Sequence, residues 1–125
     1  MPLHAYGLDA LYLARSAAVA QFIVDAGGVA VLLAVLATPF WQAHAAPPPL
    51  KQDIVCTATR VLRFVATARR GAVPLADALA AVRAGLRTMR RTSYGYLGMF
   101  LTALELRDAA DAAAMEALLE YMREV

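Results

Sequence analysis

The sequence has little of what most catalytic or metal-binding sites require. It contains one cysteine, Cys56, which excludes a disulfide within the chain. Its two histidines, His4 and His44, have no Cys, Asp or Glu at helical ligand spacing, whereas a metal site needs three or four converging ligands. Glycine-rich phosphate loops and the G-x-S-x-G nucleophile motif are also absent. We therefore expect no catalytic residues, no metal, no cofactor and no enzymatic activity.

A secretory signal and strand patterns are missing as well. The first residues lack a basic segment followed by an apolar stretch, so the expected location is intracellular and cytoplasmic. Because no run alternates with period 2, nothing predicts a sheet. Apolar residues make up 61% of the 125-residue chain, against roughly 45–50% in soluble domains, and many are alanine. These features predict one domain covering residues 1–125 with an all-α fold.

Residues 26–41 carry no charge and raise the question of a membrane span. As a helix they would cover about 24 Å, less than a hydrocarbon core of about 30 Å. Gly27 and Gly28 favour a turn, and Pro39 ends the apolar helix after it, so that helix is expected to cover only residues 29–38. A buried helix of a soluble core is the favoured interpretation. The alternative is a small subunit of a membrane complex, inserted through residues 17–41.

Hydrophobic spacing and breaking residues predict six helices. They cover residues 8–24, 29–38, 50–67, 74–90, 94–106 and the segment after the expected N-cap Asp108. A proline-rich connector is expected at residues 39–49, and Gly71 ends the third helix. The fold is expected to be an armadillo-like right-handed superhelix or a compact bundle of about six helices.

The apolar positions of these helices predict a core. The first helix is expected to contribute Leu8, Leu11, Tyr12, Val19, Phe22 and Ile23, and the fourth Leu75, Leu79, Val82, Leu86 and Met89. The second helix and the fifth, at 94–106, are apolar nearly all round, which predicts burial. Met115, Leu118, Met122 and Val125 form the stripe of the last helix, and Cys56 is expected to be a buried small hydrophobe.

Charge is unevenly distributed along the chain. Residues 54–91 contain eight arginines and one acid, whereas residues 92–125 contain six acids and two arginines. The candidate partner-binding residues are Arg60, Arg63, Arg83, Arg87, Arg90 and Arg91. They form either a solvated face partly paired with the acidic last helix, or a docking patch for an acidic protein or peptide. Nucleic acid is disfavoured because few aromatic residues are interleaved with these arginines.

Three segments carry a resemblance to a known family. Residues 22–36 (FIVDAGGVAVLLAVL) resemble the turn and long helix of an armadillo or HEAT-like repeat, and residues 71–82 (GAVPLADALAAV) resemble a second copy of that unit. Residues 58–66 (ATRVLRFVA) stand in the place of the middle helix of the repeat. The turns at Gly27 and Gly71 lie 44 residues apart, near the length of such a repeat. Where peptide-binding armadillo proteins place a tryptophan and an asparagine, Arg60 and Phe64 stand here, so recognition of nuclear-signal peptides is not implied.

The resemblance implies an interaction module with about two repeats, although such folds need about three for stability. Either the last two helices close the core, or a partner covers the open end. The predicted function is a non-catalytic protein–protein interaction or scaffold module with an acidic protein partner. Homo-oligomers and membrane contact remain open, and a Bcl-2-like helical regulator with a central helix at 94–106 is a further alternative.

Overall fold

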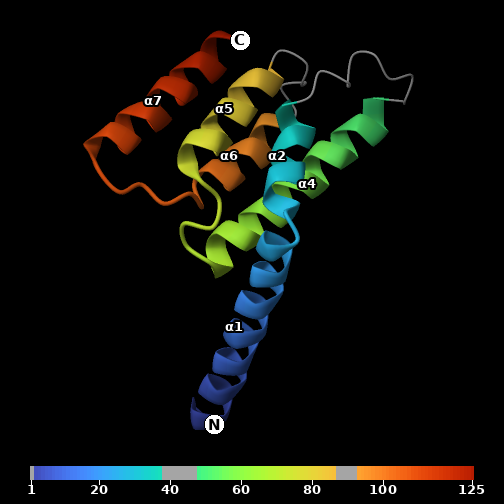
Figure 1. Cartoon of the computed structure of the whole chain (residues 1–125), viewed down its shortest axis with the longest axis vertical. Coiled ribbons are helices and arrows are strands. Elements are labelled where there is room, and N and C mark those ends of the chain that lie inside the picture. The colour runs from blue at the N-terminus through green and yellow to red at the C-terminus, as the bar shows by residue number, and fades with distance from the viewer. Residues whose placement is uncertain (1, 38–47, 87–92) are drawn as a thin grey trace.

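The computed structural model describes residues 2–37, 48–86 and 93–125, with side chains described for 14–37, 53–86 and 93–125. Over these ranges the chain is helical and has no strand, which confirms the predicted all-α fold (Figure 1). The six helices found there are α1 (Pro2–Asp25), α2 (Gly28–Ala37), α4 (Pro48–Ala68), α5 (Leu75–Gly85), α6 (Tyr94–Leu101) and α7 (Ala109–Glu124).

The predicted proline-rich connector at 39–49 lies mostly outside the described residues. Its last two prolines, Pro48 and Pro49, belong to the first turn of α4, so the expectation that they extend the connector is wrong. Proline is accepted there because the first N–H groups of a helix have no intrahelical acceptor. The third predicted helix thus begins earlier than its apolar pattern indicated.

Two glycine turns separate a long helix from the short helix that comes after it. Gly27 comes after α1 with φ of 76°, and Gly71 comes after α4 with φ of 80°. A residue with a Cβ pays about 1–2 kcal/mol in this left-handed region. The amide of Gly27 donates to the carbonyl of Val24 at 3.0 Å, and that of Ala72 donates to Arg69 at the same distance. Both predicted turns are confirmed.

The helix contacts form two series. α4 packs against both α1 and α6, and α5 packs against both α2 and α7. α2 also contacts α4, which connects the two series. The helices can be grouped in three consecutive pairs: α1 with α2, α4 with α5, and α6 with α7. The middle pair, α4 and α5, contacts both of the others. Figure 1 shows α1 extending beyond the other helices toward the N-terminus.

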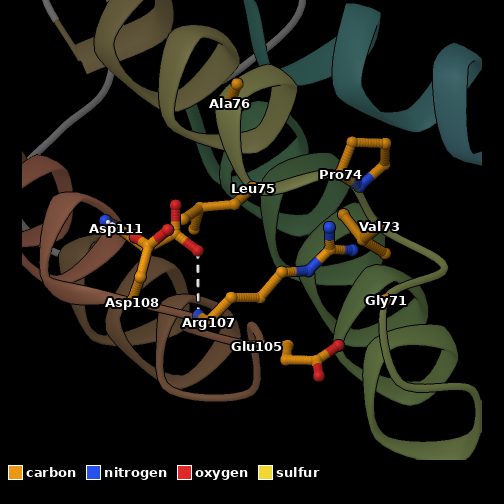
Figure 2. A pocket seen from close by; sticks show the side chains of 9 residues that line it. All are labelled: Gly71, Val73, Pro74, Leu75, Ala76, Glu105, Arg107, Asp108 and Asp111. Carbon is orange, nitrogen blue, oxygen red and sulfur yellow. Dashed lines mark hydrogen bonds between the residues drawn. The ribbon is translucent and has the colours of Figure 1, made fainter.

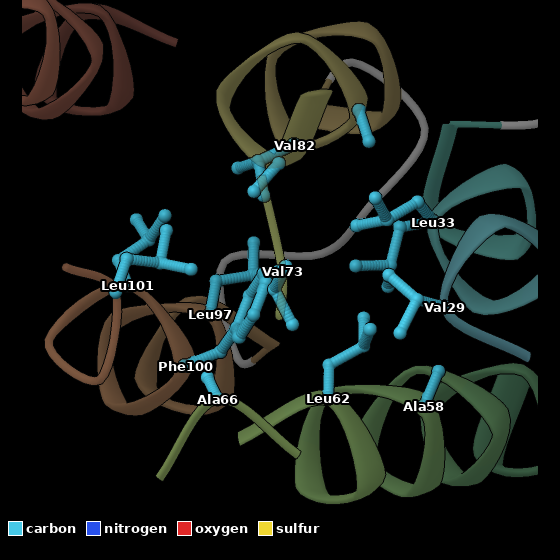
Figure 3. Packing of buried hydrophobic residues seen from close by; sticks show 14 of the residues in the cluster. Val29, Leu33, Ala58, Leu62, Ala66, Val73, Val82, Leu97, Phe100 and Leu101 are labelled. Carbon is cyan, nitrogen blue, oxygen red and sulfur yellow. The ribbon is translucent and has the colours of Figure 1, made fainter. Parts of the chain in front are cut away.

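The core lies among α2, α4, α5 and α6 (Figure 3). Leu33, Leu62, Val82, Leu97 and Phe100 meet there, and each is buried. Burying such a side chain stabilises the fold by about 1.5–3 kcal/mol. Because the four helices are distant in sequence, this cluster fixes their arrangement.

The buried face of α5 differs from the predicted leucine seam. Val82 and Leu86 are buried as expected, but Leu75 and Leu79 are only half-buried, and Met89 lies outside the described residues. The other buried positions of α5 are small: Ala78, Ala81 and Gly85. Small side chains let neighbouring helix backbones approach closely, so α5 packs by close contact rather than through a leucine seam.

The first two helices leave apolar side chains uncovered. Val19 is 51% exposed and Phe22 is 73% exposed, so the prediction that they are core residues is wrong. Val31 in α2 is 62% exposed, which corrects the expectation that this helix is buried on all sides. Ile23 is half-buried, and the side chains of Leu8, Leu11 and Tyr12 lie outside the described residues. The cause is that α1 and α2 pack on one side only.

The predicted helix at 94–106 is shorter and less buried than expected. α6 ends at Leu101, and turns come after it. Leu97, Phe100 and Leu101 are buried, whereas Met99 is half exposed, so α6 has one buried face and one open face. Leu104 is buried beyond the helix end, which explains why the apolar pattern continued past it.

Candidate functional site

The solvent face of α4 and the turn after this helix carry a basic strip, defined as Arg60, Arg63 and Arg70. Arg60 and Arg63 lie one turn apart on the helix, and Arg70 lies in the turn before Gly71. All three side chains are exposed. The opposite face of α4 buries Ala58, Leu62 and Val65. The amphipathic spacing of this helix therefore directs Arg60 and Arg63 toward solvent.

Arg83 is exposed on α5 but contacts another helix. Its guanidinium carbon lies 4.4 Å from the centroid of the Tyr121 ring on α7. A cation over an aromatic ring at this distance contributes about 0.5–1 kcal/mol at an exposed site. Arg83 therefore helps to hold α7 on α5. Arg87, Arg90 and Arg91, the other candidate partner-binding residues, lie outside the described residues and stay predictions.

Acidic side chains gather on α7, away from the basic strip. Glu116, Glu120 and Glu124 are exposed at successive turns, as the sequence predicted. Across the described ranges, the ion pair found is that of Arg123 with Glu120, at 2.8 Å within α7 itself. In this part of the chain, the contact that α5 makes to α7 through Arg83 is aromatic rather than ionic.

A surface pocket of about 340 Å³ lies where α5 and α7 begin (Figure 2). Asp108 caps α7, accepting a hydrogen bond from the amide of Asp111 at 2.9 Å, which confirms the predicted N-cap. Asp111 in turn accepts from the amide of Arg107 at 2.8 Å. Figure 2 shows the Arg107 side chain reaching toward Val73 and Pro74, near Gly71. The pocket is thus the junction between two helix starts.

The chemistry of this pocket does not form a binding site for an anion or a metal. Glu105, Asp108 and Asp111 line it against the single cation Arg107, and the two aspartates accept the hydrogen bonds that start α7. No group of three His, Cys, Asp or Glu residues that could hold a metal ion occurs in the portion with described side chains. The hydrogen bonds of Asp108 and Asp111 stabilise the start of α7.

Cys56 lies on the surface rather than in the core. It is half-buried, so the expectation of a fully buried thiol is wrong. The interaction of its side chain with the Tyr96 hydroxyl of α6, through hydrogen bonding first, raises the pKa of Tyr96. The charge on the sulfur, desolvation and Asp53 raise that pKa further, while Arg60 lowers it. The contact joins α4 to α6 next to the basic strip.

The apolar segment at 17–41 is divided by the turn at Gly27. Over the described residues, no individual helix has the length and apolar character to cross a membrane. Ala14–Asp25 and Gly28–Ala37 meet those criteria only when taken together, and they join at a bend of 70°.

Comparisons with protein-family models, with curated proteins and with solved structures found no match. The candidate surfaces therefore come from the chain alone. Sequence patterns found the arginines of α4, but they missed the exposed Val19 and Phe22. The charged residues Arg15 and Asp25 lie on the same side of α1 as Val19 and Phe22, and their spacing in the sequence could have indicated that this side faces solvent.

Proposed function

We propose that the chain is a non-catalytic protein–protein interaction module whose basic strip on α4 binds an acidic segment of a partner protein. The observation that carries the proposal is the exposure of Arg60 and Arg63 on one face of α4 and of Arg70 in the turn after it, with no acid among them. In the described ranges none of these three forms an ion pair within 4 Å. Guanidinium groups in such a row favour bidentate contacts with carboxylates.

The packing of the helices supports an interaction module. α4 contacts both α1 and α6, and α5 contacts both α2 and α7, so successive helix pairs stack on one another. In helical-repeat proteins this kind of stacking presents one helix of each unit along an extended surface. Together with the armadillo-like segments, it favours a scaffold surface over a closed ligand cavity. The rigid core beneath α4 would hold the arginine side chains in a fixed row.

A binding titration tests the proposal with two probes of equal charge. One is a fluorescent peptide rich in Asp and Glu, and the other is a single-stranded oligonucleotide. We expect the chain to bind the peptide more tightly, with an affinity that falls as salt rises. Reversing both Arg60 and Arg63 to Glu should weaken peptide binding by at least about tenfold, because attraction becomes repulsion.

The matched control reverses Arg107 and Arg123 to Glu, which changes the net charge by the same amount but leaves Arg60, Arg63 and Arg70 in place. This control should bind the peptide with an affinity within about twofold of the unchanged chain. Equal losses in both variants would show attraction by net charge alone and would contradict a site on α4. Tighter binding of the oligonucleotide would also contradict the proposal.

Membrane association is the second candidate function, favoured by the apolar pair of helices α1 and α2. Its specific support is that Ala14–Asp25 and Gly28–Ala37, taken together, have the length and apolar composition of a membrane span. Carbonate extraction of membranes from cells that make the chain separates the two functions. An interaction module leaves with the supernatant, and an inserted subunit stays in the pellet.

A further inference from the structure

The outer face of α1 carries a stripe of exposed side chains, named the α1 stripe: Arg15, Ala18, Val19, Phe22 and Asp25. Their spacing of three and four residues places them on one side of the helix. Ala20 on the other side is completely buried. The stripe thus has an apolar centre, with a phenyl ring 73% exposed, and opposite charges near its two ends.

The chain itself shows how such a face is normally covered. Val61 and Phe64 of α4 repeat the three-residue spacing of Val19 and Phe22. In α4 both are half-buried, and that helix packs against α1 as well as α6. α1 lacks an equivalent neighbour on its outer side among the described helices. The natural cover for the α1 stripe is therefore another helix.

The charges of the stripe identify which helix fits. Arg15 and Asp25 each lie five residues from Ala20, which corresponds to about 15 Å between them. Consider an antiparallel copy of α1 whose two-fold axis crosses the stripe at the level of Ala20 along the helix. This arrangement would bring Arg15 of each chain beside Asp25 of the other. The same axis sets the bulky Phe22 against the small Ala18. A parallel copy would instead oppose like charges.

We propose that the chain forms a symmetric homodimer in which the α1 stripes of two copies pack antiparallel. A stripe that is complementary to itself in charge and size is what an isologous two-fold interface requires. The dimer covers the apolar ring of Phe22 and closes the end of the helix stack that α1 and α2 leave open. This surface lies on a different helix from the basic strip of α4, so the two proposals are independent.

Sedimentation velocity on the full chain over a range of concentrations tests the dimer. The unchanged chain should sediment as a dimer at high concentration. Phe22→Glu should raise the dissociation constant by at least about a hundredfold, because it places a charge at the interface centre. Its circular dichroism should match the unchanged chain, since Phe22 is exposed. Arg63→Glu on α4 is the matched control and should dimerise normally.

Charge reversal tests the antiparallel register. Arg15→Glu and Asp25→Arg should each weaken the dimer about tenfold, because each creates two repulsive contacts. The double variant R15E/D25R should restore the dimer, since all contacts become attractive again. A chain that stays monomeric at every concentration would overturn the proposal, including one that instead floats with phosphatidylcholine–phosphatidylglycerol vesicles. A dimer that the double variant does not restore would overturn the register and with it the proposed interface.

Discussion

At the scale of single residues, the two turn glycines share a backbone conformation but have different surroundings. Both have φ near 80°, where glycine is favoured. A Cβ on Gly27 would meet no atom within 4 Å, whereas a Cβ on Gly71 would lie 3.2 Å from a carboxylate oxygen of Glu105. A residue with a Cβ would therefore have the same unfavourable backbone conformation at both positions, and at Gly71 it would also crowd the Glu105 side chain.

We predict that Gly27→Ala lowers the free energy of unfolding by about 1–2 kcal/mol and that Gly71→Ala lowers it by at least as much. Urea denaturation followed by circular dichroism measures both. Gly98→Ala is the control, because Gly98 lies inside α6 with open space around it. Removing a helical glycine should raise stability by about 0.5–1 kcal/mol. An unchanged Gly27→Ala variant would refute the role assigned to this turn.

Tyr96 provides a pH-dependent signal. Its pKa lies above the ordinary value because it interacts with the Cys56 side chain, through hydrogen bonding first and charge second. The folded state thus holds the phenol proton more tightly than the unfolded state does. The stability from this contact is present below the ordinary tyrosine pKa of about 10 and is lost as the pH rises above it.

We predict that Cys56→Ala lowers the pKa of Tyr96 toward its ordinary value, because this substitution removes the two largest causes of the shift. Ultraviolet difference titration of tyrosine ionisation measures the pKa, and Tyr96→Phe identifies which part of the signal belongs to this residue. If Cys56→Ala titrates like the unchanged chain, the hydrogen bond does not set the pKa.

At the scale of helices, the start of α7 depends on one side chain. Asp108 accepts from the Asp111 amide at 2.9 Å, which satisfies one of the otherwise unpaired N–H groups of the first turn. We predict that Asp108→Ala lowers the free energy of unfolding by about 1 kcal/mol. Asp108→Asn should retain most of this stability, because its amide oxygen can also accept. Thermal unfolding measures both variants, and an equal loss in the two would count against capping.

Element positions were predictable from the sequence because their signals are local. The glycines that end α1 and α4, and Asp108 at the start of α7, act through hydrogen bonds to near neighbours. Helix ends without such a signal were misplaced. α6 ends at Leu101, although apolar residues continue to the buried Leu104.

Which face of a helix is buried was harder to predict. α1 has apolar residues on several sides, so its spacing does not distinguish the inner Ala20 from the outer Phe22. That choice depends on which neighbours a helix has, and these lie far away in sequence. The same limit applies to the candidate site: the exposure of Arg60 and Arg63 was predictable, but the stacking of Arg83 on Tyr121 was not.

At the scale of the whole molecule, the two ends of the helix stack differ. α6 and α7 cover one end, with Met115, Leu118 and Met122 of α7 buried. At the other end, Val19, Phe22 and Val31 are exposed on α1 and α2. The last two helices thus contact the middle pair, α6 packing on α4 and α7 on α5. This open end is the surface that the proposed dimer through α1 would cover.

The position of α7 predicts that this helix unfolds locally more readily than the other helices. Its main contact is with α5, whereas α4 contacts three helices, so α7 can open while the packing among α2, α4, α5 and α6 persists. Leu118→Ala removes a fully buried side chain from this contact and should cost about 2–5 kcal/mol locally. Hydrogen exchange should then accelerate across Ala109–Glu124 while α4 stays protected. Leu119→Ala is the control, because Leu119 is exposed on the same helix and should change little. Equal acceleration in α4 and α7 would show that the stack unfolds as one unit.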